Sequence, residues 1–227
     1  MWTFPPAILG SVTTPTPPDD FGTLVVELLF ETGAPGGPTN NTGSLGGTAV
    51  FGDGGTGNFP TIVTSGGFDG GYMSFAAVGG NPKATASIGF SSDLIIGTAN
   101  FKIEVQAWFS TYATTFGQIL WGWGNGSPSP NLIVGTDGNL HFIDGVISID
   151  TGHVVDLDMT FRKYTLQRLN GVASVLVDDV EVYSGAYTSN CNVGYSAQSF
   201  KVGTQGNGSG GLSGAALDEF RFYNANV

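Results

Sequence analysis

The sequence predicts an all-β domain, an antiparallel β-sandwich. Apolar residues recur in short runs with a period of two, turn signals separate these runs every 8–12 residues, and no helical periodicity extends beyond a turn or two. Gly supplies 37 of the 227 residues, while charged residues reach only 11%. The 41% of apolar residues is enough for a sizeable core and argues against disorder.

Twelve strand segments follow one another from residue 23 almost to the end of the chain. They span 23–31, 71–78, 84–90, 101–110, 118–124, 131–135, 139–143, 146–149, 162–170, 173–183, 199–204 and 217–223. The Gly/Asn/Thr-rich segments 32–47 and 52–59 between the first runs are predicted to be loops, and loops of such length are usually functional or ordered by partners.

The segment "FKIEVQAWFS" at 101–110 alternates most clearly. Its odd-numbered side chains predict a buried face and its even-numbered ones, including Trp108, a more polar face. Hairpin turns are predicted at Asn170-Gly171 and at Asp178-Asp179. In the last strand, Phe220 and Phe222 are expected in the core beside Asp218. Leu217, Glu219, Arg221 and Tyr223 are expected on the opposite face, with the strand next to the first one.

Residues 1–21 form a Pro/Thr-rich arm, and residues 22–227 form the sandwich domain. The arm composition favours extended or polyproline II backbone. Two interpretations stay open: a free tail, or an arm that docks on other subunits or on copies of the chain. Its large apolar side chains would anchor a docked arm: Trp2, Phe4, Ile8 and Leu9.

Charge and cysteine usage exclude several functions. The net charge is −11 and no Lys or Arg precedes Lys83, so the sequence predicts neither a nucleic-acid groove nor binding to anionic membranes. Cys191 is the one cysteine, which rules out an intrachain disulfide. The N-terminus lacks a cationic segment followed by a continuous apolar run, so no signal peptide is predicted.

The order of the segments resembles the laminin-G-like branch of the concanavalin A-like lectin/glucanase superfamily. "LLFETG" with its small-residue loop, "IEVQAWF", "TFRKYTLQRLNG", "VLVDDVEVY", "FKVGT" and "LDEFRFYN" are similar, in that order, to the strands of such domains. The resemblance covers roughly 23–224 and implies a concanavalin A-like jelly roll. The chain departs from the family at Phe161, usually Trp, at Arg162-Lys163, usually a His pair, and at Asp179, usually the Gly of an Asp-Gly turn.

Catalytic chemistry is not expected. Glucanases of the superfamily use two carboxylates that project from one strand onto the concave face. Asp178, Asp179 and Glu181 occupy a predicted turn, and the adjacent Asp218 and Glu219 are expected to point to opposite faces. The two histidines, His141 and His153, and Cys191 show neither a nucleophile motif nor the ligand spacing of a zinc site.

The resemblance leaves calcium open, since such domains often hold Ca²⁺ between rim loops. The candidate ligands are Asp53, Asp69, Asp137 and Asn139, and each aspartate also has an ordinary reading as an Asp-Gly turn residue. Glycan binding needs an exposed aromatic platform with polar neighbours. Trp121, Trp123 and Asn125 are the candidates, with burial of the tryptophans in the sandwich as the alternative; for Trp108 a structural role is preferred.

These observations predict a non-enzymatic structural protein of a virion, such as a bacteriophage head-decoration, head-fibre or tail protein. Its lectin-like domain would face outward, its arm would bind other virion subunits, and it would form a homo-oligomer. The alternative is an extracellular bacterial carbohydrate-binding or adhesion module. A glycoside hydrolase is the third hypothesis and lacks a carboxylate pair of the expected spacing.

Overall fold

A computed structural model describes residues 20–31, 38–52, 59–68, 70–76, 85–89, 91–112, 117–123, 128–191, 200–204 and 211–227. The predicted antiparallel β-sandwich is confirmed, because strands in antiparallel sheets make up nearly all of the regular structure in these residues. Within the same ranges, the one helix is a short 3₁₀ turn, Ser92–Leu94, and no helix is long and apolar enough to cross a membrane.

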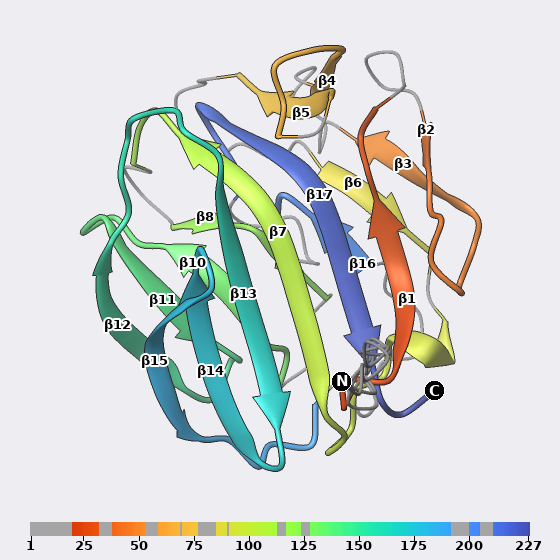
Figure 1. Ribbon diagram of the computed structural model, residues 1–227, viewed down its shortest axis with the longest axis vertical. Coiled ribbons are helices and arrows are strands. Elements are labelled where there is room, and N and C mark those ends of the chain that lie inside the picture. The colour runs from red at the N-terminus through yellow and green to blue at the C-terminus, as the bar shows by residue number, and fades with distance from the viewer. Residues whose placement is uncertain are drawn as a thin grey trace, which may run out of the picture.

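One layer is an eight-stranded sheet in the order β15-β14-β13-β7-β17-β5-β4, with β1 paired to the second half of β17 (Figure 1). Its strands are β1 (Thr23–Leu28), β4 (Thr61–Val63), β5 (Tyr72–Phe75), β7 (Phe101–Phe109), β13 (Arg162–Leu169), β14 (Val172–Val177), β15 (Val180–Ala186) and β17 (Ala215–Asn224). The last strand therefore lies beside the first, as predicted from the sequence.

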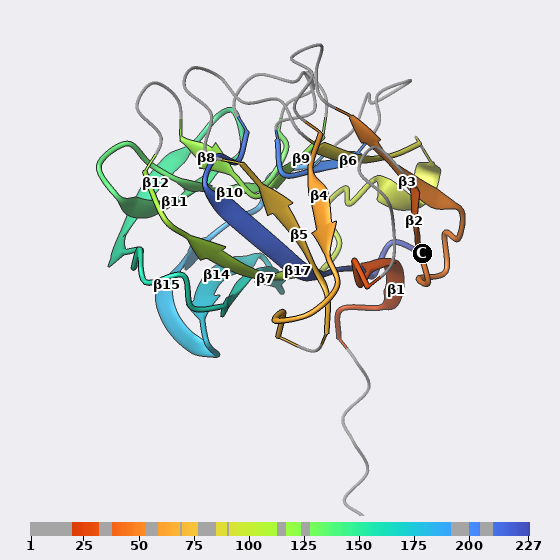
Figure 2. The same ribbon diagram turned by 90° about the horizontal axis from the view of Figure 1, so that it is seen from above.

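Two smaller sheets form the opposite layer, in the orders β12-β11-β10-β8 and β2-β3-β6-β16-β9 (Figure 2). Their strands are β2 (Pro38–Asn40), β3 (Thr48–Gly52), β6 (Thr85–Ile88), β8 (Gln118–Ile119), β9 (Trp121–Gly122), β10 (Asn131–Val134), β11 (Asn139–Ile143), β12 (Ser148–Val154) and β16 (Phe200–Val202). The prediction of one loop over 32–47 was wrong at β2, whose three residues carry no apolar alternation and form a strand by pairing with β3.

The core lies between the layers and follows the predicted face of β7. Phe101, Ile103, Val105, Ala107 and Phe109 are all fully buried, together with facing aromatic rings from the second layer. The other face of the eight-stranded sheet is open. Figures 1 and 2 show that this sheet is strongly curved, with β15 at one edge standing forward of β7 and β17, which makes the open face concave.

The β14–β15 hairpin shows how the chain manages without the usual Asp-Gly turn. Asp178 and Asp179 both have positive φ values, 49° and 66°, which is the left-handed conformation that a glycine would adopt more readily. The Asp178 carboxylate accepts a hydrogen bond of 2.8 Å from the Lys163 backbone NH. This contact ties the turn to β13 and offsets part of the backbone cost.

Arg168 in β13 is a charged residue within the core, with 1% of its surface exposed. Its guanidinium donates hydrogen bonds to the carbonyl oxygens of Gly97, Ala99 and Ser189 at 2.6–2.9 Å. The rings of Phe101 and Tyr187 lie 5.2 and 5.4 Å from the guanidinium carbon. Arg168 therefore joins the segments around 97–99 and 187–191 to the central sheet.

We expect Arg168→Met to lower the free energy of unfolding by about 3 kcal/mol or more, because buried carbonyl groups lose their donors at roughly 1–3 kcal/mol each. Gln167→Met is the matched control, since the neighbouring side chain lies on the partly exposed face and its replacement is expected to change stability by about 0.5 kcal/mol or less. Urea denaturation of both variants measures the difference. Equal stabilities would contradict the role given to Arg168.

Candidate functional site

The concave face depends on a β-bulge in β17. The pairing of β17 with β7 shifts register between Asp218 and Phe220, and Glu219 has a φ of 45°. Asp218 pairs with Gln106 and Arg221 with Glu104, so the extra residue changes the alternation. The prediction that Asp218 faces the core and Leu217 the opposite side was wrong. Leu217 pairs with Ala107 on the core face. Asp218, although fully buried beneath the Phe68 loop, shares the concave side with Glu219.

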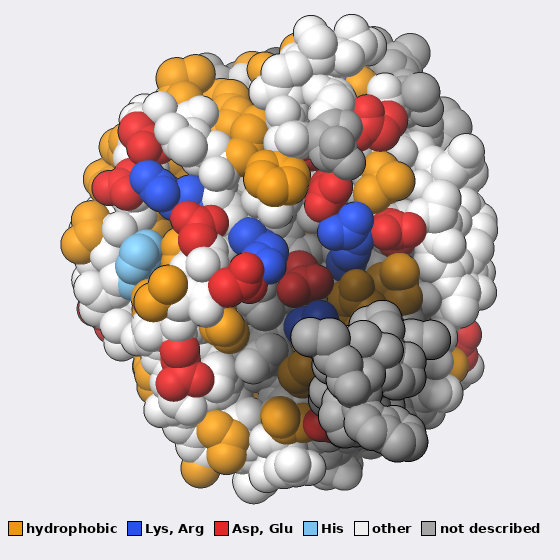
Figure 3. All heavy atoms as spheres, in the orientation of Figure 1, with side chains coloured by type: hydrophobic (Ala, Val, Ile, Leu, Met, Phe, Trp, Pro, Cys, Tyr) orange, Lys and Arg blue, Asp and Glu red, His pale blue; other side chains and the backbone are white. Residues whose placement is uncertain are grey.

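Beside the bulge the concave face holds a hollow of ≈ 240 Å³. Its lining residues come from β7, β13 and β17 and from the loop before β5: Phe68, Glu104, Val105, Gln106, Lys163, Glu219 and Arg221. Figure 3 shows charged side chains of both signs gathered across the middle of this face, around a recessed centre. Most of the lining consists of hydrogen-bonding groups, which suits a polar ligand.

Both cations of the lining are already paired with carboxylates. Arg221 contacts Glu27 and Glu219, each at 2.9 Å, and Lys163 contacts Asp179 at 2.5 Å. Hydrogen bonds from Thr42 and Arg221 lower the pKa of Glu27 below its ordinary value. The hollow is thus lined by ion pairs, in which each cation is held by a carboxylate.

Aromatic side chains flank the hollow. Tyr72, Trp108 and Phe161 are partly exposed and meet edge to face, with ring centroids 5.6–6.4 Å apart. Phe68 lines the hollow itself and is 62% exposed. Its backbone NH donates to the Asp218 carboxylate at 2.6 Å, so the bulge also positions this loop. Figure 3 shows apolar side chains next to the charged ones on this face.

The predicted tryptophan platform is corrected by the structure. Trp121 is fully buried and packs against Phe220, and Trp123 is 2% exposed and packs against Phe200 and Phe222. Both therefore join the two layers of the core and are shielded from ligands. Trp108, for which the sequence predicted a structural role, is partly exposed and lies on the open face. Asn125 lies outside the described residues.

Other predicted site residues fall outside the described ranges as well. They are the arm anchors Trp2, Phe4, Ile8 and Leu9 and the calcium candidates Asp53 and Asp69. The remaining calcium candidates, Asp137 and Asn139, are described and lie together at the turn between β10 and β11, on the outer side of the four-stranded sheet.

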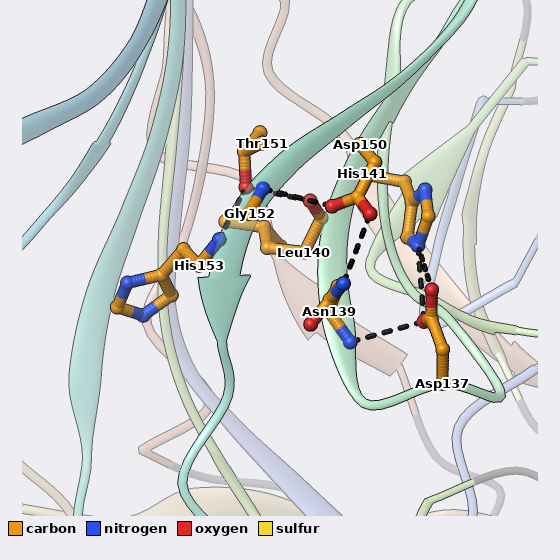
Figure 4. Close-up of polar contacts among 8 residues, drawn as sticks. All are labelled: Asp137, Asn139, Leu140, His141, Asp150, Thr151, Gly152 and His153. Atoms are coloured by element: carbon orange, nitrogen blue, oxygen red, sulfur yellow. Dashed lines mark hydrogen bonds and ion pairs between the residues drawn. The ribbon is translucent and has the colours of Figure 1, made fainter.

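Two residues that the sequence analysis left out of a metal site, His141 and Asp150, join them there (Figure 4). The His141 Nε2 lies 3.1 and 3.2 Å from the two Asp137 carboxylate oxygens, and this contact holds the pKa of Asp137 below its ordinary value. Asp150 is the direct cross-strand partner of His141. The i, i+4 spacing of Asp137 and His141 was visible in the sequence, but Asp150 arrives through strand register.

No protein-family model matches the chain, and no curated protein matches it. Solved structures do resemble it. Domain 4 of the arabinanase AbnA from Geobacillus stearothermophilus has a TM-score of 0.64 at 16% identity, covering 89% of this chain and 92% of that one.

The binding domains of two toxins are also similar. Paraclostridial Mosquitocidal Protein 1 gives a TM-score of 0.60 at 13% identity, and botulinum neurotoxin serotype D/C gives 0.59 at 9%. The matches cover 89% and 88% of this chain but only 49% and 48% of those chains. These similarities support the β-sandwich fold.

The contact between Asp218 and the loop before β5 can be tested directly. Asp218→Ala removes a fully buried acceptor and leaves the Phe68 NH without it, so we expect a loss of about 1–3 kcal/mol in the free energy of unfolding. Faster hydrogen exchange at the Phe68 amide should accompany this loss. Asp218→Asn keeps an oxygen acceptor, so its Phe68 amide hydrogen should exchange more slowly than that of the Ala variant. Unchanged exchange in Asp218→Ala would contradict this role of the bulge.

Proposed function

We propose that the chain is a non-catalytic carbohydrate-binding domain whose concave face binds a neutral glycan. The observation that carries the proposal is the juxtaposition of exposed Phe68 and the Tyr72–Trp108–Phe161 cluster with a hollow lined by polar groups. Aromatic rings present apolar faces to the C–H groups of a sugar ring, while carboxylate, amide and guanidinium groups bond its hydroxyls.

The charges on this face favour a neutral ligand over an acidic one. Lys163 and Arg221 are each held by carboxylates, and Glu104 lies 3.7 Å from Lys102. An acidic sugar would have to displace one of these carboxylates from its cation. Otherwise it would lie beside the carboxylate, and the two negative charges would repel each other. The net charge of −11 adds to the repulsion of anionic ligands.

The absence of catalysis is part of the proposal. The sequence predicted it partly because Asp218 and Glu219 were expected to point to opposite faces, and the structure removes that reason. Because of the bulge, Asp218 and Glu219 do share the concave side. The contacts of the two carboxylates supply another argument. A glycosidase uses a pair of carboxyl groups that both reach the sugar. Here the Glu219 carboxylate is already bound by the Arg221 guanidinium at 2.9 Å, and Asp218 is fully buried and accepts a hydrogen bond from the Phe68 NH.

The structural neighbours agree with glycan recognition by this architecture. The arabinanase domain was solved with arabinotriose, and cell entry of botulinum neurotoxin type C depends on two ganglioside molecules. These properties belong to those proteins. For this chain they support the choice of ligands to test first, neutral oligosaccharides together with sialylated ones as the contrast.

Calorimetric titration of tag-free protein with neutral, uronic-acid and sialylated oligosaccharides tests the proposal. We expect saturable binding of a neutral oligosaccharide and weaker or no binding of its acidic counterparts. Phe68→Ala should weaken binding about tenfold, or ~1.4 kcal/mol, by removing a stacking surface at little cost in stability. Trp108→Ala should weaken it by at least as much.

The control is Val146→Ala, which replaces an exposed apolar side chain on the other layer and should bind as the unaltered protein does. Preference for acidic oligosaccharides, or unaltered affinity in both Phe68→Ala and Trp108→Ala, would overturn the proposed site. Release of reducing ends from any bound oligosaccharide would overturn the non-catalytic assignment.

The virion role is a finer proposal that rests on the composition of the arm, of which residues 1–19 lie outside the described residues. Under it, the arm attaches the domain to other virion subunits or to copies of itself, and the concave face points outward to glycans of a host or its surroundings. Detection of the chain in purified virions would support this role. Its recovery as a secreted bacterial module would favour the extracellular alternative.

A further inference from the structure

A second cluster of ligand-forming groups lies on the opposite layer, away from the concave face. Asp137, His141 and Asp150 each offer one donor atom, and the three atoms lie within 4.8 Å of one another. From this geometry we infer that the chain has a binding site for a divalent late transition-metal ion, such as Zn²⁺, formed by the carboxylates of Asp137 and Asp150 and the imidazole of His141.

The donor set selects the class of ion. Calcium and magnesium take oxygen ligands, whereas imidazole nitrogen is a preferred ligand of zinc, copper and nickel. Two carboxylates with one imidazole can neutralise a divalent charge and leave coordination positions for water. The calcium that the family resemblance left open would find a nitrogen donor here, so the ion inferred from the donors differs from that candidate.

The separations fit one ion. In a tetrahedral site with bonds of ~2.0–2.1 Å, neighbouring donor atoms lie about 3.3 Å apart. The His141 Nε2 and the Asp137 carboxylate oxygens, at 3.1 and 3.2 Å, are already near that spacing. The Asp150 carboxylate lies on the next strand, with its donor atom within 4.8 Å of the other two. It needs only a small movement toward them, because the Asp150 backbone is directly opposite that of His141.

Local structure brings these side chains close. Gly135 lies against the Asp137–His141 pair, and a Cβ there would stand 2.3 Å from the Asp137 Oδ1 and 2.6 Å from the His141 Nε2. Gly138, with a φ of +83°, turns the chain back into β11. A residue with a side chain at position 135 would therefore push the two donors apart.

Neighbouring groups orient the two carboxylates. The Asn139 side-chain amide donates to the Asp150 Oδ2 at 2.9 Å, and the Gly152 NH donates to the Oδ1 at 2.8 Å. The Asn139 NH donates to the Asp137 Oδ1 at 3.0 Å. Such outer hydrogen bonds fix ligand geometry in metal sites. Asn139, one of the candidate calcium ligands, thus acts as a positioning residue for both carboxylates (Figure 4).

The cluster is also accessible. Asp137 and His141 line a hollow of ≈ 400 Å³ on the outer face of the four-stranded sheet, whose floor includes Gly117, Ile133 and Gly135. An ion can enter from solvent, and an ion held at the edge of this hollow could carry water or a small ligand in it. This cavity is a second feature that points to a ligand, separate from the contacts within the cluster.

The test is titration of tag-free, metal-free full chain with Zn²⁺ by calorimetry and with Co²⁺ by visible absorption. We expect saturation at a single ion, a thermal transition raised by Zn²⁺, and no comparable effect of Ca²⁺. His141→Ala should weaken Zn²⁺ binding by about 100-fold and Asp150→Asn by about tenfold or more, with metal-free melting temperatures close to that of the unaltered protein.

His153→Ala is the matched control, because this second histidine belongs to β12 and its ring points away from the three donors in Figure 4. It should bind Zn²⁺ as the unaltered protein does. The inference is overturned if no saturable Zn²⁺ binding occurs, if His141→Ala binds equally well, if His153→Ala loses as much affinity, or if Ca²⁺ binds as tightly as Zn²⁺. The result is independent of whether the concave face binds glycans.

Discussion

The register shift between β7 and β17 is the constraint on which the concave face depends. One extra residue at Asp218–Glu219 keeps Leu217, Phe220 and Phe222 on the core side and places two consecutive acidic side chains on the other. From there Asp218 holds the loop that carries Phe68, and Glu219 holds Arg221. Without the bulge, alternation would send one half of β17 to the wrong face.

The core that supports this face is built from rings of both layers. Trp121 meets Phe220 at 6.0 Å and Trp123 meets Phe222 at 5.7 Å, so the second layer is anchored directly behind the bulge. Burial of these rings stabilises the curved sheet, whereas Trp108, Tyr72 and Phe161 lie on its outward face. Among the described residues, the same packing thus separates the buried Trp121 and Trp123 from Trp108, which a ligand can reach.

The sequence could predict the fold because alternation and turn signals are local. The ten residues of "FKIEVQAWFS" specify two faces, and the predicted neighbours β1 and β17 do pair. Alternation cannot say which of two faces meets the other layer, which is why the sequence left both an exposed platform and burial in the core open for Trp121 and Trp123. Nor could it reveal a bulge at Asp-Glu, where no glycine marks the left-handed residue. Asp150 reaches His141 only through strand register, which spacing along the chain does not encode.

The most direct test of the central claim is to map where a sugar binds. Backbone and indole NMR signals of the labelled protein, recorded during titration with a neutral oligosaccharide that binds, should shift around Phe68, Tyr72, Trp108 and Glu219. Signals of Asp137, His141 and Asp150 should stay in place. Shifts confined to the four-stranded sheet, or none on the concave face at saturation, would contradict the account.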